Sequence, residues 1–287
     1  MKLATFSHGG VPQPGIVVGN RVHPAPEATM LDLIRGGQSA LDQLVALARS
    51  AGPQEGHALD SVTLQAPIPR PTKNVFCVGR NYKLHIEEGA RANGIEVKFP
   101  PVPEFFSKPP TAVIGTGTEV RLPAVTRQLD YEVELAIVIG KTCRDVSAAQ
   151  AAECILGYTI VNDITARDLQ RAHGQWFKGK GLDTTCPIGP WIVTADEFGV
   201  DREHRIWLAV NGERRQDSVI SDMLFSCSQI VESLSQGMTL EAGDIIATGT
   251  PSGVGLGLKP QIWLKDGDVV EAGIDGIGSI VNTIRAV

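Results

Sequence analysis

Cysteine is scarce and scattered in this chain of 287 residues. Its five cysteines are an odd number, and no two of them form a C-x-x-C pair; they are Cys77, Cys143, Cys154, Cys186 and Cys227. Disulfide frameworks and zinc knuckles need paired or clustered cysteines, so neither is indicated. Most of the five are expected to be buried small hydrophobic residues.

Long apolar runs are absent as well. The strongest of them, such as residues 135–139, fall far short of the roughly 20 residues that cross a bilayer. The amino-terminal segment reaches His8, Gly9 and Gly10 without the apolar core of a secretion signal. We therefore expect a cytoplasmic protein that has no membrane partner.

An excess of positive charge is also lacking. The 26 lysines and arginines are outnumbered by 32 aspartates and glutamates, which gives a formal net charge of −6. Without a global positive field, we expect no nucleic-acid partner and no affinity for anionic lipid. The hydrophobic fraction of 43% and the charged fraction of 20% are those of an ordinary folded protein.

The chain is long enough for one large domain with a small appendage, or for two domains. Its first part carries two short strand patterns, an apolar stretch and a helix pattern, at residues 3–7, 15–18, 30–34 and 40–49. Pro67, Pro69 and Pro71 then exclude helix and favour an extended linker. The predicted division is a small domain over residues 1–70 and a main domain over residues 71–287.

Short β patterns dominate the main domain. They lie at residues 75–78, 132–139, 158–163, 191–194, 206–210, 245–248 and 268–274. Helix signals are fewer: a capping box at Ser147 opens a helix to about Leu156, and Thr165 begins a shorter one that ends by Gly174. The Asn-Gly pair at residues 211–212 predicts a hairpin turn. Strands outnumber the helices between them, so we predict a β-rich α+β fold rather than a doubly wound sheet.

Three acidic residues follow or interrupt apolar strand patterns. Glu132 and Glu134 are two residues apart in a strand pattern, so their side chains point the same way and repel each other. Asp163 ends the next strand pattern. Three carboxylates without histidine or cysteine suit Mg²⁺ or Mn²⁺, with Ca²⁺ as a further candidate. The alternative for the two glutamates is a solvated strand edge.

The helix after Asp163 carries Arg167 and Gln170, which share a face at a spacing of three. Both could hold a carboxylate or oxo group of a ligand. The alternative for Arg167 is an ion pair with Asp168 or a surface acid.

A glycine-rich loop at residues 176–190 carries two lysines, one of which is Lys180. A lysine near an enolate would stabilise its negative charge, although a lysine in such a loop is more often solvated. Cys186 lies in the same segment, directly before Pro187 and without a nearby histidine, so burial is favoured over a nucleophilic role.

His85 and Glu88 are three apart in a helix pattern that follows a strand. On one face, the carboxylate can orient the imidazole and raise its basicity, so that His85 can deprotonate water. The alternative is a surface pair.

Residues 248–255, Thr-Gly-Thr-Pro-Ser-Gly-Val-Gly, offer N–H groups and hydroxyls for an anion. They lack the P-loop lysine and the dinucleotide spacing, which argues against ATP and NAD.

In combination, these segments resemble the fumarylacetoacetate hydrolase family over residues 71–287. The shared motifs, in order, are G-x-N-Y-x-x-H-x-x-E from Gly79, D-Y-E-x-E-L from Asp130, N-D-x-T-A-R-D-x-Q from Asn162, G-K at Lys180 and T-G-T-P-x-G from Thr248. The resemblance implies a mixed β-roll or β-sandwich carboxy-terminal domain, preceded here by a small α+β domain. It also implies a Mg²⁺ or Mn²⁺ site and a homodimer.

The resemblance assigns roles by motif position. Metal ligands are Glu132, Glu134 and Asp163. The base dyad is His85 with Glu88, and Lys180 stabilises the enolate or oxyanion. Substrate-binding positions are Arg80, Tyr82, Arg167, Gln170 and Thr250. No aspartate occurs at residues 78–81, where the family's larger hydrolases have an extra ligand, so the chain is more similar to the shorter bacterial and acylpyruvase-type members.

The function that this resemblance implies first is hydrolysis of a carbon–carbon bond in a 2,4-dioxo acid, an acylpyruvate of the type formed in aromatic or sugar-acid catabolism, through a pyruvate enolate. The alternative is a decarboxylase, isomerase or hydratase acting on a 2-oxo acid or diacid such as oxaloacetate or 2-hydroxyhepta-2,4-diene-1,7-dioate. A lesser alternative is a non-catalytic ligand-binding protein.

Overall fold

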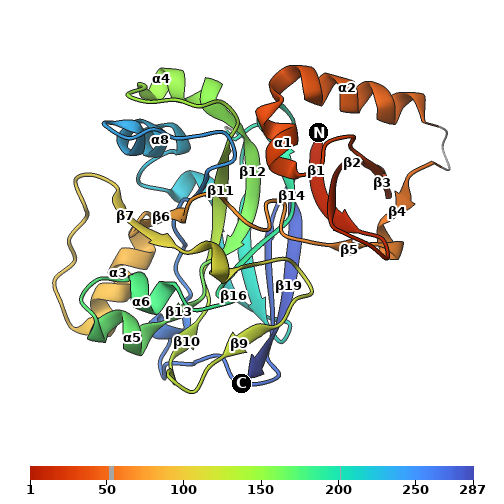
Figure 1. Cartoon of the computed structure of the whole chain (residues 1–287). Helices are drawn as coiled ribbons and strands as arrows, with labels where there is room; N and C mark the ends of the chain where they lie inside the picture. Colours follow the sequence, from red (N-terminus) through yellow and green to blue (C-terminus); the bar gives the residue numbers. More distant parts are fainter. Residues whose placement is uncertain (52–54, 201) are drawn as a thin grey trace.

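The computed structural model of the chain describes residues 1–51, 55–200 and 202–287 (Figure 1). Its strands are β1 (Lys2–Ser7), β2 (Gln13–Val18), β3 (Arg21–Pro24), β4 (His57–Ala58), β5 (Thr63–Leu64), β6 (Val75–Gly79), β7 (Glu104–Lys108), β8 (Val113–Ile114), β9 (Val120–Leu122), β10 (Leu129–Asp130), β11 (Val133–Ile139), β12 (Ile155–Asn162), β13 (Thr165–Ala166), β14 (Cys186–Thr194), β15 (Arg205–Val210), β16 (Glu213–Val219), β17 (Ile245–Ala247), β18 (Val269–Ile274) and β19 (Gly278–Ala286). Its α-helices are α1 (Met30–Arg35), α2 (Gly37–Ser50), α3 (Lys83–Asn93), α4 (Ala148–Ala151), α5 (Arg167–Ala172), α6 (Phe177–Lys180), α7 (Ala195–Phe198) and α8 (Cys227–Ser235).

One large sheet runs through the molecule in the order β4-β3-β2-β1-β14-β12-β11-β17-β6-β7. Its first four strands come from the amino-terminal part and join the rest through antiparallel pairing of β1 with β14. Figure 1 shows this part, with α1 and α2, beside the central strands β11, β12 and β14. The domain division near residue 70 remains a prediction. The structure shows that strands from both sides of residue 70 belong to the same sheet.

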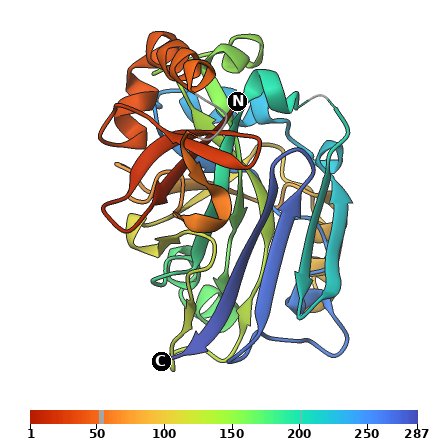
Figure 2. The same ribbon diagram turned by 90° about the vertical axis from the view of Figure 1, so that its right-hand side faces the viewer.

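A second, five-stranded sheet has the order β16-β15-β18-β19-β9. Its long antiparallel strands stand side by side at the right of Figure 2. The main hydrophobic core contains residues of both sheets, including Leu135, Ile137 and Ile139 from β11. The alternate residues of β11, Ala136 and Val138, belong to the core that α1 and α2 cover. Because β11 is buried on both faces, its sequence after Glu134 is a continuous apolar run over residues 135–139 rather than an alternating one.

The predicted β-rich α+β fold is confirmed, and most strand patterns lie within a residue or two of an observed strand. The Asn-Gly hairpin is also confirmed: it joins β15 to β16, and both residues have the positive φ of a primed turn, 51° at Asn211 and 80° at Gly212. Every helix in the described ranges is too short or too polar to span a membrane.

Three predicted elements differ from the structure. The helix predicted from Thr165 begins later, at Arg167, because Thr165 and Ala166 form β13 and pair with β10. The helix from Ser147 begins with the expected capping box, but α4 ends at Ala151, a 3-10 turn continues it over Ala152–Cys154, and Ile155 already pairs with β11, so sheet pairing ends the helical segment before the predicted Leu156. The glycine-rich segment that we expected to be a loop contains the short helix α6, whose last residue is Lys180. The sequence patterns also missed β7, β19 and α8.

Candidate active site

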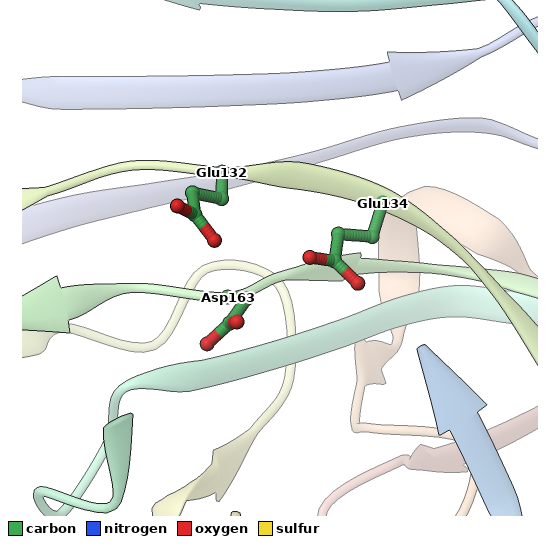
Figure 3. Close-up of side chains that lie close together, drawn as sticks. All are labelled: Glu132, Glu134 and Asp163. Atoms are coloured by element: carbon green, nitrogen blue, oxygen red, sulfur yellow. The ribbon is translucent and has the colours of Figure 1, made fainter. Parts of the chain in front are cut away.

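Three carboxylates converge at one end of the central strands. Glu132 directly precedes β11 and Glu134 lies within it, while Asp163 follows the end of β12. The Asp163 N–H donates to the Glu132 carbonyl over 2.8 Å, which holds the two strand ends together. One oxygen of each carboxylate lies within 4.8 Å of the others, and all three residues are buried. Figure 3 shows the three side chains close together. Their burial excludes the alternative of a solvated strand edge.

Glu132 is paired with two cations. Arg167 Nη2 donates to its Oε1 over 2.5 Å, and Lys180 Nζ donates to its Oε2 over 2.6 Å. Burial by itself raises the pKa of Glu132, but the charges of Arg167 and Lys180 outweigh burial and hold this pKa well below its usual range. Arg167 also donates to Asp130 over 2.8 Å. Glu132 is therefore ionised at neutral pH.

Glu134 differs, because no cationic side chain among the described residues forms a hydrogen bond or ion pair with it. Its Oε2 accepts a hydrogen bond from the Gly249 N–H over 2.8 Å. Burial raises the pKa of Glu134 well above its usual value, and the charges of Asp163 and Glu132 raise it further. Of the three carboxyl groups, Glu134 is thus the one whose ionised form is least favoured while no cation is bound.

Lys180 bridges two of the carboxylates. Its Nζ lies 2.6 Å from Asp163 Oδ2 and 2.6 Å from Glu132 Oε2. Burial alone lowers the pKa of a lysine, but the two carboxylates more than offset this effect and raise the pKa of Lys180 above its usual value. Lys180 therefore remains a protonated donor, and the alternative of a solvated surface lysine is wrong.

Lys108 is a member of the cluster that sequence analysis missed. Its fully buried ammonium donates to Asp163 Oδ1 over 2.7 Å, to the Ile164 carbonyl over 3.0 Å and to the Lys180 carbonyl. The available signal is a lysine at the end of the strand pattern Glu-Phe-Phe-Ser-Lys, directly before two prolines. That signal by itself also fits a solvated strand end.

A cavity of about 500 Å³ lies over the carboxylates. Many of the predicted site residues line it: Arg80, His85, Glu132, Glu134, Arg167, Gln170, Lys180 and Thr250. Phe106 and Trp176 add an apolar wall, and their rings meet edge to face at 5.5 Å. A cavity with cations, amide groups and a carboxylate cluster suits a small anionic ligand.

The helix α3 places His85 and Glu88 on one face, as their spacing predicts. His85 Nδ1 lies 3.4 Å from Glu88 Oε2, and the Glu88 oxygens accept hydrogen bonds from the Gly253 N–H over 3.0 and 3.2 Å. Glu88 is 8% exposed and packs closely on Gly257, where an added Cβ would lie 2.1 Å from the Glu88 carboxyl carbon. The pair is therefore fixed and largely buried, not a surface pair, and the other ring nitrogen of His85 is left for the cavity.

The segment at residues 248–255 does bind anions, but they are carboxylates of the protein itself. Three glycine N–H groups donate to three of them: Gly249 to Glu134, Gly253 to Glu88 and Gly255 to Asp130. This segment therefore positions a triad carboxylate, the dyad glutamate and the aspartate that holds Arg167.

Two of the predicted substrate-binding residues, Tyr82 and Thr250, do not offer a free hydroxyl to a ligand in the cavity. Tyr82 does not line the cavity; it is 2% exposed, pairs with Met223 through a β-bridge, and its hydroxyl has no hydrogen-bond partner in the described ranges. This position does not support a direct contact between Tyr82 and substrate. The Thr250 hydroxyl is already engaged, since it donates to the Val133 carbonyl and accepts from Gln216, each over 2.8 Å. Arg80, Arg167 and Gln170 are better placed.

The triad fits a hard divalent cation. Its donors are all carboxylate oxygens, the set that Mg²⁺, Mn²⁺ and Ca²⁺ prefer. The surroundings of Glu134 indicate a cation site, because a buried, ionised carboxylate without a cationic partner destabilises the fold unless a cation binds it. Glu132, Glu134 and Asp163 are thus the residues that could hold such an ion, and its identity stays a prediction.

A family model described as fumarylacetoacetate (FAA) hydrolase C-terminal matches residues 74–285. The chain belongs to the fumarylacetoacetate hydrolase family. Its relatives include the oxaloacetate tautomerase YisK of Bacillus subtilis, 50% identical over 229 residues that cover 79% of this chain and 75% of that protein. The mitochondrial oxaloacetate tautomerase Fahd2a of Rattus norvegicus is 38% identical over 271 residues, which cover 94% of this chain and 84% of that protein.

Solved structures of the fumarylacetoacetate hydrolase family confirm the fold over the whole chain. The fumarylacetoacetate hydrolase EaFAH from psychrophilic Exiguobacterium antarcticum has a TM-score of 0.86 at 40% identity, with 100% of both chains covered. The amino-terminal residues, which resemble the family only loosely in sequence, are therefore included in the match.

Proposed function

We propose that this protein catalyses keto–enol tautomerisation of a small 2-oxo dicarboxylic acid of the oxaloacetate class. Two relatives with high coverage are oxaloacetate tautomerases, which favours the isomerase alternative over carbon–carbon bond hydrolysis. The observation that carries the proposal is that His85 and Lys180 line one cavity together with the carboxylates Glu132 and Glu134. His85, which can carry a proton, and Lys180, which can stabilise negative charge, can therefore contact the same ligand.

The cavity can orient a dianionic substrate. Arg80, Arg167 and Lys180 supply three positive charges to its lining, and Gln170 supplies an amide. Arg167 and Lys180 are both bonded to the buried carboxylate of Glu132, whereas Arg80 pairs with the half-exposed Glu104 over 3.2 Å and donates to the Lys98 carbonyl, both in exposed or half-exposed segments. Arg80 is therefore the cation most easily turned toward a substrate carboxylate.

Tautomerisation moves one proton between the C3 carbon and the C2 oxygen and breaks no carbon–carbon bond. His85 takes the proton from one of these two atoms and delivers it to the other, because Glu88 orients its Nδ1 and leaves the other ring nitrogen for substrate. Lys180 stays protonated and donates a hydrogen bond to the oxygen on which negative charge develops. The cation that Glu132, Glu134 and Asp163 could hold would supply Lewis-acid polarisation of the 2-oxo group.

The test is a spectrophotometric assay of enol-oxaloacetate decay in a weakly catalytic buffer with Mg²⁺ or Mn²⁺. We expect the protein to accelerate the decay, and a coupled assay for pyruvate to show that ketonisation greatly exceeds decarboxylation. Decay at the buffer rate with both metals would contradict the proposal.

Hydrolysis of an acylpyruvate is the second candidate, favoured by the fixed His85–Glu88 pair, which suits activation of water. One structural relative is itself called a fumarylacetoacetate hydrolase. Assays of acylpyruvates beside oxaloacetate separate the two candidates: release of pyruvate and a free acid, at a kcat/KM above that for enol-oxaloacetate, would assign hydrolysis as the main activity.

The family resemblance also implies a homodimer, which we include in the proposal. Sedimentation velocity at micromolar concentration tests it, with a particle of twice the 30.6 kDa chain mass as the expected result.

A further inference from the structure

Lys108 and Lys180 hold the same carboxylate from opposite sides. Lys108 Nζ donates to Asp163 Oδ1 over 2.7 Å, and Lys180 Nζ donates to Asp163 Oδ2 over 2.6 Å. The two ammonium groups are chemically alike, and both are buried. Their surroundings nevertheless differ in a way that separates their roles.

The bonds of Lys108 join three segments of the chain. Lys108 ends β7, and its ammonium reaches the Asp163 carboxylate, the Ile164 carbonyl after β12 and the Lys180 carbonyl at the end of α6. These three acceptors use all three N–H donors of a lysine. Lys108 does not line the cavity. It is a fixed cross-link behind the site.

Lys180, by contrast, lines the cavity, and both of its carboxylate partners belong to the triad. The oxygens that it occupies, Glu132 Oε2 and Asp163 Oδ2, are on groups that a cation would need. A cation and the Lys180 ammonium therefore compete for the same carboxylates. Lys180 is the exchangeable partner of Asp163.

We propose that Lys108 is a positioning residue for the cation site: it holds Asp163 in place through Oδ1 while Lys180 gives way to the cation at Oδ2. Through the Lys180 carbonyl it also fixes the helix end from which the Lys180 side chain acts. This inference rests on the proposed cation site and adds a division of labour between two lysines. A lysine that only stabilised the fold would change the free energy of unfolding and leave cation affinity alone.

The experiment compares Lys108→Met with Lys180→Met by calorimetric titration of the full-length protein with Mn²⁺ alone. Both variants remove one ammonium from Asp163 and keep a similar volume, so each controls for the other. We expect Lys108→Met to weaken Mn²⁺ binding about 10- to 100-fold, the usual cost of losing a group that orients a metal ligand. We expect Lys180→Met to bind Mn²⁺ as tightly as the natural protein or more tightly, although its activity is lost.

Lys108→Gln serves as a second variant if Lys108→Met does not fold, because its amide still donates a hydrogen bond but lacks the charge. Equal Mn²⁺ affinity in the natural protein and the folded Lys108 variant would overturn the inference and leave the proposed function standing. Equal weakening by Lys108→Met and Lys180→Met would also overturn it. No Mn²⁺ binding by the natural protein would contradict the cation site itself, and with it the proposed function.

Discussion

Glu134 is the residue at which the charges of the site are out of balance. Glu132 has Arg167 and Lys180, and Asp163 has Lys108 and Lys180, but the described contact of Glu134 is one backbone N–H. A protein without bound cation can relieve this imbalance by keeping Glu134 protonated. The residue therefore links cation binding, pH and stability.

The metal-free protein should become less stable as pH rises above the ordinary carboxyl pKa. The pKa of Glu134 is 4.5 in the unfolded state and higher in the folded state. At a pH between the two pKa values the folded state binds more protons than the unfolded state, so the free energy of unfolding falls with rising pH. Glu134→Gln removes this dependence. In chelator, the two proteins should have similar melting temperatures near pH 4, and the variant should melt higher at pH 8. Parallel curves from pH 4 to pH 8 would refute this role.

His85→Ala should lower turnover of enol-oxaloacetate by about 10²- to 10⁴-fold, the usual contribution of general acid–base catalysis. Mn²⁺ affinity should be unchanged, because the proposed metal ligands are three carboxylates and His85 is not among the ligands. Steady-state kinetics and calorimetry on the same preparation measure both effects. Unchanged turnover would remove His85 from the mechanism.

At the scale of elements, the site depends on how α3 docks against the turn at Gly255–Gly257. The Glu88 side chain fills the space that a side chain at position 257 would occupy, and the Gly253 N–H donates a hydrogen bond to the Glu88 carboxylate. The geometry of the dyad is thus set by backbone groups more than 160 residues away in sequence.

Gly257→Ala should displace Glu88 and misorient His85, so that kcat falls at least tenfold while the protein stays folded. The new Cβ would meet the Glu88 carboxyl group at 2.1 Å. Gly10→Ala is the matched control, because an added Cβ there has nothing within 4 Å and no strained φ. If Gly257→Ala has the same kcat as the control, the observed position of Glu88 is not required for catalysis.

Sequence patterns identified the triad because its carboxylates interrupt apolar strands, where a charge stands out. They could not identify Lys108, because its partners come from the ends of β12 and α6, and only the folded sheet brings these together. Similarly, the capping box at Ser147 correctly predicted where a helix begins, but its end is set by pairing of Ile155 with β11. Local signals thus predict starts and residue types, while tertiary pairing decides ends and partners.

At the scale of the whole molecule, one sheet connects the amino-terminal strands to the site-bearing strands through β1 and β14. The core under α1 and α2 also contains Ala136 and Val138, which follow Glu134 along β11. Stabilising the carboxylate cluster should therefore stabilise the molecule as one unit.

Saturating Mg²⁺ or Mn²⁺ should raise the melting temperature of the natural protein. Binding at 100 times Kd adds about 2.7 kcal/mol to the free energy of unfolding, and each kcal/mol corresponds to roughly 2–4 °C in a chain of this size class. Asp163→Asn should lose most of the shift. An equal shift in that variant would place the bound ions elsewhere on the molecule.

The central claim, that Glu132, Glu134 and Asp163 together hold one divalent cation, is tested most directly by anomalous diffraction from crystals grown with Mn²⁺. The account predicts a single strong anomalous peak bonded to an oxygen of each of the three carboxylates, with the Lys180 ammonium withdrawn from at least one of them. A cluster without a peak, and with Lys180 still bridging Glu132 and Asp163 at saturating Mn²⁺, would contradict it.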